Sequence, residues 1–149
     1  MANSAFGHKS TLYFLVSILM LTSGCSTIRT SHEEAMLMEA SRLTKLSSAV
    51  EATVRYEPDV HTLSEAEILQ QATAHDSTLL SSFQHRLLRV KVENRHALVL
   101  VCTKDGHRGL IEDAGCSAAA DKHLWMSPSA PCEFTLQITE VCLSPPSPH

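Results

Sequence analysis

The spacing of apolar residues changes along the chain, and each change predicts a different kind of element. Over residues 32–56 the apolar positions recur every three or four residues, as on one face of an α-helix. They are Met36, Ala40, Leu43, Val50 and Val54, with Ser47 completing the series. Because the series is shorter than three heptads, we expect this helix to pack on its own domain rather than in a coiled-coil dimer.

A second helix is predicted over residues 62–84. Pro58 separates it from the first helix, because the residue before a proline is pushed out of the helical region. Ser64 and Glu67 fit a capping box at its start. The apolar stripe that follows consists of Ile68, Leu69, Ala72, Leu79, Leu80 and Phe83. Asp76 falls on this stripe, and we interpret it as a break at which a second short helix begins rather than as a buried functional carboxylate.

From residue 87 the period changes to two, which is typical of strands. Apolar and charged residues first alternate, as in Leu88, Arg89, Val90, Lys91 and Val92. Residues 97–102 are apolar throughout, which predicts a central strand buried on both faces. The sequence Lys-Asp-Gly at residues 104–106 favours a hairpin turn into a third strand at residues 109–112.

The last predicted strand covers residues 132–142, where apolar Phe134, Leu136 and Ile138 alternate with polar residues. The fold class is therefore α+β over residues 32–143. Two N-terminal helices precede a mainly antiparallel sheet of about four strands within residues 87–142. Residues 144–149 form a Pro-rich tail.

The first 24 residues have a different pattern. The 13 residues from Thr11 to Ser23 carry no charge, and Lys9 precedes them. A run this short does not cross a bilayer as a helix, which needs about 20 residues. A charged start, an apolar middle and small residues at the end are typical of a secretory signal segment. The run ends in Leu-Thr-Ser-Gly-Cys at residues 21–25, which resembles the lipobox of bacterial lipoprotein precursors.

This resemblance implies cleavage after Gly24, so that residues 1–24 are the signal segment and residues 25–31 a lipidated tether. Acylation of the thiol and the new amine of Cys25 would anchor the chain to a membrane. Ser26 after the cysteine implies the outer membrane of a Gram-negative cell, with the domain on the periplasmic side. The alternatives are an ordinary cleaved signal with a free periplasmic product, and an uncleaved short anchor.

The cysteine count agrees with export. If Cys25 carries lipid, an even set of four remains, namely Cys102, Cys116, Cys132 and Cys142, which suits two disulfides in an oxidising compartment. A straight strand over residues 132–142 would hold its two cysteines roughly 33 Å apart, whereas a disulfide allows about 7 Å between Cα atoms. Two pairings stay open: Cys102–Cys132 with Cys116–Cys142, or Cys102–Cys142 with Cys116–Cys132. The three spacings between these cysteines lack the close CxxC pairs of zinc sites, so no metal site is predicted.

The net charge of −4 argues against a nucleic-acid partner. The charge is uneven, because residues 85–108 hold six Lys and Arg against two acids. Such a region is a candidate site for an anionic or protein partner, and the alternative is a solvated face. The candidate residues are Arg86, Arg89, Lys91, Arg95 and Arg108, with Trp125 as an apolar interface anchor or, alternatively, a core residue.

Catalytic motifs are lacking: the chain has no GxSxG elbow, no glycine-rich phosphate loop and no HExxH. We therefore predict no catalytic residue and no cofactor. The leading hypothesis is a non-enzymatic, lipid-anchored protein of the outer membrane that binds an envelope protein. A small envelope hydrolase or its accessory subunit, and an anion-binding module using residues 85–108, are the alternatives.

Overall fold

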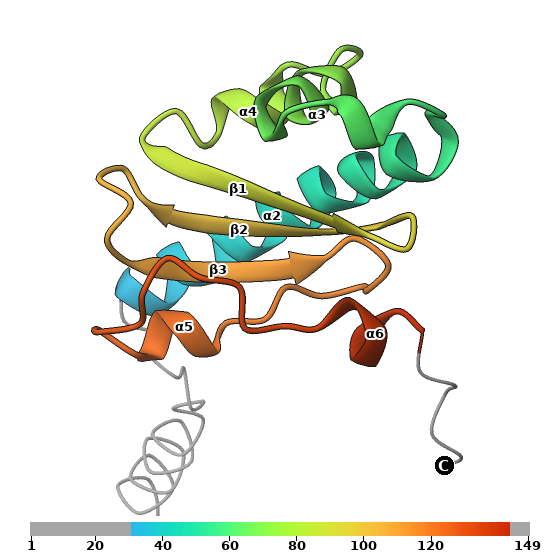
Figure 1. Ribbon diagram of the computed structural model, residues 1–149. Coiled ribbons are helices and arrows are strands. Elements are labelled where there is room, and N and C mark those ends of the chain that lie inside the picture. The colour runs from blue at the N-terminus through green and yellow to red at the C-terminus, as the bar shows by residue number, and fades with distance from the viewer. Residues whose placement is uncertain (1–30, 144–149) are drawn as a thin grey trace, which may run out of the picture. The chain divides into compact units, whose positions relative to one another are not determined.

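A long helix lies across one face of a three-stranded sheet, and the C-terminal segment lies along the other (Figure 1). The computed structural model describes residues 31–143. The predicted signal segment, Cys25, most of the predicted tether and the Pro-rich tail lie outside the described residues. Helix α2 (Ser31–Tyr56) buries the predicted stripe, including Leu43, Val50 and Val54, against the sheet. It thus packs on its own domain, as predicted.

The second helical region begins as the sequence predicts but is divided. A 3-10 turn, η2 (Val60–Thr62), precedes α3 (Glu65–Ala72), and α4 (Thr78–Ser81) follows. The capping box is confirmed: the backbone N–H of Glu67 donates to Ser64 Oγ (3.3 Å), and that of Ser64 donates to the Glu67 carboxylate (2.8 Å). The helical region predicted over residues 62–84 is therefore not one continuous helix. The chain breaks where Asp76 was expected to break it, and the exposed Asp76 carboxylate accepts the N–H of Thr78 (3.0 Å).

The sheet has the order β1-β2-β3, with antiparallel neighbours. Its strands are β1 (Arg86–Glu93), β2 (His96–Thr103) and β3 (Gly109–Ala114). The β1–β2 turn places both Asn94 (φ 52°) and Arg95 (φ 63°) in the left-handed region, as the tightest hairpin turns require. These two hairpins confirm three of the four predicted strands.

Strand β2 is buried on both faces, as its unbroken apolar run predicts. Ala97, Val99 and Val101 face α2 and join the main core. Leu98, Leu100 and Cys102 point the other way and pack against the C-terminal segment. The two faces of this one strand therefore organise the two layers that cover the sheet.

The fourth strand predicted at residues 132–142 is wrong. Residues 132–137 make no strand pairing, and a short helix, α6 (Ile138–Val141), follows them. The outer edge of β3 is already occupied, since Glu112 pairs with Asp121 and the N–H of Gly109 donates to the carbonyl of Ala130 (3.0 Å). The alternating residues Phe134, Leu136 and Ile138 instead pack flat on the sheet face. Among residues 31–143, no helix combines the length and apolar character needed to cross a membrane.

Candidate functional site

The basic residues of β1 are engaged by carboxylates of the same domain. Arg86 makes two hydrogen bonds to Glu39 on α2 (2.6 and 2.9 Å), and Arg89 contacts Glu65 at the start of α3 (3.0 Å). These hydrogen bonds raise the pKa of both guanidinium groups. Because neighbouring residues of a strand alternate between faces, Arg86 and Arg89 lie on opposite sides of the sheet.

Arg95 and Arg108 are engaged by backbone carbonyls. Arg95, in the β1–β2 turn, donates to the carbonyl of Arg55 at the end of α2. Arg108 precedes β3, and its Nη2 donates to the carbonyl of Trp125 (3.0 Å). Lys91 lies 3.4 Å from Glu93. The predicted basic residues are thus distributed over both faces and one turn, and each has at least one partner within the domain. Nε of Arg108 is buried without a hydrogen-bond partner among residues 31–143.

Trp125 lies in the core. It belongs to α5 (His123–Met126), is 8% exposed, and packs with the residues between α2 and the sheet. Its indole N–H donates to His32 Nδ1 (3.3 Å). This burial removes Trp125 as a surface anchor and fits the alternative of a core residue.

The four cysteines of the domain form two disulfides, Cys102–Cys132 and Cys116–Cys142. This is one of the two pairings left open by the sequence. The sequence argument excluded a Cys132–Cys142 bridge because a straight strand would hold these two cysteines far apart. That predicted strand is wrong, but the two cysteines are still not paired with each other. The C-terminal segment runs along the sheet face, so that Cys132 packs near Cys102 and Cys142 packs near Leu98.

A buried carboxylate on α2 joins three parts of the domain. Glu51, 6% exposed, accepts the N–H of Ala97 (2.8 Å), contacts Nδ1 of His96 (2.7 Å) and accepts Nε–H of Arg55 (2.8 Å). The bond to Ala97 fixes the start of β2 against α2. A buried carboxylate is tolerated here because each of its oxygens has donors.

A second buried carboxylate starts a chain of polar contacts across the C-terminal layer. Glu112 on β3 is fully buried and accepts the N–H groups of Thr135 (3.0 Å) and Leu136 (3.2 Å), together with the Thr135 hydroxyl. Thr135 Oγ1 also lies 3.0 Å from His123 Nε2, and His123 Nδ1 lies 2.7 Å from Asp121 Oδ1. Burial acts to raise the pKa of Asp121, but the hydrogen bonds from His123 outweigh it and lower that pKa.

An acid, an imidazole and a hydroxyl in line form the arrangement of hydrolytic triads, in which the imidazole removes the hydroxyl proton. Here the Thr135 hydroxyl donates its hydrogen bond to Glu112 instead. The same carboxylate holds the Thr135 backbone. Through these contacts Glu112 fixes residues 135–136 onto β3.

Asp113, beside Glu112, is a buried acid of a different kind. Its Oδ1 accepts the Ser117 hydroxyl (2.8 Å), whereas its buried Oδ2 has no hydrogen-bond partner within residues 31–143. The nearby hydroxyls of Thr44 and Ser47 donate to carbonyls of their own helix. Burial raises the pKa of the Asp113 carboxyl, and the nearby hydroxyls of Ser117, Thr44 and Ser47 oppose this only in part.

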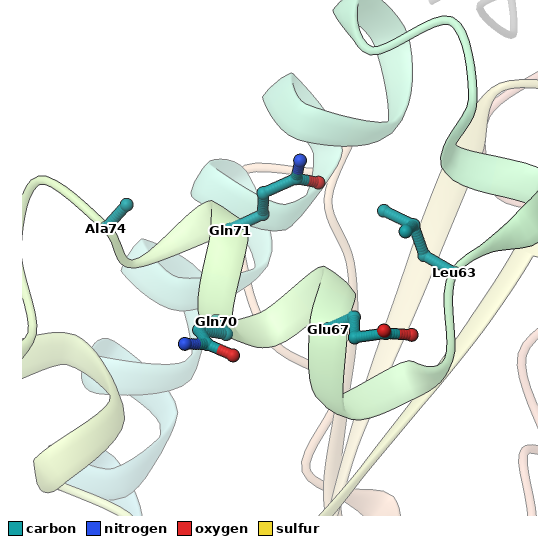
Figure 2. A pocket seen from close by; sticks show the side chains of 5 residues that line it. All are labelled: Leu63, Glu67, Gln70, Gln71 and Ala74. Atoms are coloured by element: carbon teal, nitrogen blue, oxygen red, sulfur yellow. The ribbon is translucent and has the colours of Figure 1, made fainter.

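An open depression of about 380 Å³ lies beside α3 (Figure 2). It is lined by Leu63, Glu67, Gln70, Gln71 and Ala74. The Glu67 carboxylate is engaged in the capping box, which lowers its pKa. The lining contains no nucleophile, histidine or basic residue, and none of the predicted site residues contributes to it.

Sequence reasoning missed Glu51, His96, Glu112 and His123. Glu112 and Asp113 carried a usable signal. Two adjacent acids in a short, otherwise apolar strand are either buried with partners or end the strand. Glu51 lies one helical turn after Ser47, next to the buried stripe. The two histidines gave no signal, because their partners come from distant segments.

The comparisons with known proteins add no assignment: no family model, no curated protein and no solved structure matches this chain.

Proposed function

We propose that this chain is an exported lipoprotein, anchored through Cys25, whose domain binds a protein partner in the cell envelope. The observation that carries the proposal is the pairing of Cys102, Cys116, Cys132 and Cys142 with one another. This pairing uses every cysteine except Cys25. It supports the interpretation in which the remaining thiol is the site of acylation.

The position of the two disulfides supports a role outside the cytosol. Each joins the sheet or its following loop to the C-terminal segment, and together they hold a layer that lacks strand pairing. A bridge of this kind contributes roughly 2–4 kcal/mol. Such bridges persist in oxidising compartments and are reduced in the cytosol. A fold that depends on them therefore suits the periplasm.

A protein partner is favoured over a polyanion, because the guanidinium groups of Arg86 and Arg89 already bind carboxylates of the domain. On the sheet face that carries Arg89, the side chains of Leu87, Arg89 and Lys91 stay between 37% and 42% exposed. This mixture of apolar and basic groups suits an acidic segment of a protein. We propose Lys91 as its basic contact, since Arg89 is already held by Glu65.

The anchor is tested by intact mass spectrometry of the full chain expressed in a Gram-negative cell. We expect a product that begins at Cys25, carries three acyl chains and contains two disulfides. Cys25→Ala should leave the N-terminal segment uncleaved and without lipid. A wild-type product that is unprocessed and fully reduced would contradict the proposal.

The partner is tested by mild crosslinking in native membranes. Lys91→Glu should weaken a specific crosslinked adduct, whereas Lys104→Glu, a matched exposed lysine in the β2–β3 turn, should not. An adduct that both variants weaken equally would point to general charge attraction, and an adduct that neither weakens would exclude Lys91 as a contact.

A hydrolase is the second candidate, and the specific observation in its favour is the contact between His123 and Thr135. A fluorophosphonate probe labels hydroxyl groups that an imidazole activates. We expect Thr135 to stay unlabelled in the full chain, because its hydroxyl donates to Glu112. Labelling at Thr135 that His123→Gln abolishes would establish the hydrolase instead.

A further inference from the structure

Three segments that are distant in the sequence bring one imidazole and two sulfurs together. His96 begins β2, Cys116 follows β3, and Cys142 ends α6. A ring nitrogen of His96 and the two Sγ atoms all lie within 4.8 Å of one another. All three residues are half-buried. The sulfurs are joined in a disulfide, so in this state they are not metal ligands.

The Glu51 carboxylate orients the imidazole of His96. Glu51 Oε1 lies 2.7 Å from Nδ1 of His96, and the carboxylate is held in turn by Ala97 and Arg55. Nη2 of Arg55 also lies 3.3 Å from Nδ1. Because both contacts are made at Nδ1, Nε2 is the ring nitrogen open to a metal, in the tautomer in which Nδ1–H donates to Glu51. Metal-bound histidines are held in the same way, by a carboxylate on the other ring nitrogen that fixes the ring and its tautomer.

We propose that reduction of the Cys116–Cys142 disulfide converts this cluster into a zinc site, with both thiolates and Nε2 of His96 as ligands. A dithiol reductant supplies the two electrons: its own sulfurs form a disulfide, and Cys116 and Cys142 become thiols. Binding of Zn²⁺ then releases the two thiol protons. The inference does not depend on lipid anchoring or on a protein partner.

The dimensions and the charge suit zinc. With Zn–S bonds of about 2.3 Å and Zn–N bonds of about 2.0 Å, the ligand atoms of a tetrahedral site stand roughly 3.5–3.8 Å apart. Breaking the disulfide lets the sulfurs separate to this distance, with the imidazole already beside them. Two thiolates neutralise the charge of Zn²⁺, so no net charge is added to a half-buried position. The fourth position is left for water.

The local backbone explains why these residues meet. Gly115 approaches α2 so closely that a Cβ there would lie 2.4 Å from Cβ of Glu51. The absence of this Cβ lets the chain after β3 bring Cys116 to His96. The same disulfide is also the more accessible one, because Cys102 in the other is fully buried. The search for CxxC spacing missed the site, since each ligand comes from a different segment.

The test uses the purified full chain and Co²⁺ as a spectroscopic probe of zinc sites. We expect the oxidised chain to show no sulfur-to-cobalt charge transfer. After reduction with a phosphine, one Co²⁺ per chain should give charge-transfer and four-coordinate d–d bands, and Zn²⁺ should displace it.

Variants separate this site from the other thiols. His96→Gln should weaken Co²⁺ binding at least about tenfold, and His107→Gln, an exposed histidine in the β2–β3 turn, should not. The double variant Cys102→Ser, Cys132→Ser should bind Co²⁺ when reduced, whereas Cys116→Ser, Cys142→Ser should lose the charge-transfer band.

A measurement on the wild-type chain guards against variants that fail to fold. Extended X-ray absorption of the zinc-loaded, reduced chain should show two sulfurs and one imidazole. Four sulfurs, or only oxygen and nitrogen ligands, would overturn the proposal. So would a reduced chain that binds no more cobalt than the oxidised one, or a folded His96→Gln variant with unchanged binding.

Discussion

Gly115 lies so close to Glu51 that a Cβ built on the glycine would stand 2.4 Å from the Cβ of the glutamate, and 2.5 Å from the carbonyl oxygen of Ser47. Real Cβ atoms are not found at such distances. The N–H of Gly115 donates to the carbonyl of Ala97 (2.9 Å), which holds the end of β3 beside β2. This contact joins α2, β2 and β3 at the point where the Cys116–Cys142 disulfide begins.

We therefore expect Gly115→Ala to lower the free energy of unfolding by several kcal/mol, since backbone atoms of α2 would have to move. Gly106→Ala is the matched control. Gly106 has a positive φ of 74°, but its Cβ would meet only the Leu87 side chain at 3.2 Å. Gly106→Ala should lower the free energy of unfolding by only about 1 kcal/mol. Urea unfolding of the oxidised chains measures both, and equal effects would contradict the close contact.

Asp113→Asn should stabilise the domain at neutral pH. Burial raises the pKa of Asp113 in the folded state, so between its ordinary value of 3.8 and the raised value the folded state holds the proton that the unfolded state has lost. Stability therefore falls as the pH rises through this window. The variant should remove that loss and gain about 1–3 kcal/mol at pH 7.

The measurement is the pH dependence of urea unfolding for wild type and Asp113→Asn. Asp59→Asn, at an exposed aspartate, controls for the general effect of removing a carboxylate. An advantage of Asp113→Asn that shrinks as the pH rises would have the wrong sign and would exclude the mechanism.

Glu112→Gln should loosen the C-terminal layer without unfolding the sheet. The carboxylate is the acceptor for the N–H groups of both Thr135 and Leu136. Hydrogen bonds to a charged group contribute about 1.5–3 kcal/mol, and the amide retains only one oxygen. Amide hydrogen exchange at residues 135–136 should accelerate at least about tenfold, whereas Glu133→Gln, at an exposed position, should leave it unchanged. Unchanged exchange in Glu112→Gln would show that the disulfides and the apolar packing hold this segment without the carboxylate.

Ser64→Ala should remove the side-chain cap of α3 and lower stability by about 1 kcal/mol. Ser77 precedes α4 but makes no side-chain cap hydrogen bond. Ser77→Ala should therefore change the thermal midpoint far less. If both variants shift the midpoint equally, the capping box contributes nothing specific.

The accuracy of the sequence predictions followed the range of the interactions. The helix over residues 32–56, the Ser64 cap and the two hairpins depend on neighbours within a few positions, and the structure contains them. The alternation of residues 134–138 correctly predicted that their apolar side chains share one face. It did not predict that this face packs on the sheet without forming a strand. A strand needs a free sheet edge, and the segment containing Asp121 and Ala130 had already taken it.

The candidate sites also depended on partners that are distant in the sequence. Charge counting selected Arg86 and Arg89, but not the carboxylates of Glu39 and Glu65 that bind them from other elements. His96 and His123 gained their partners only through folding.

The amino-acid sequence by itself determined the α+β class and the order of the first helix and three strands. It left two disulfide pairings open. Tertiary structure alone decided between them, placed Glu51 behind His96, and laid residues 132–137 on the sheet face. The reason is physical: local spacing fixes backbone conformation and the buried face, whereas partners far apart in the chain meet only when layers pack.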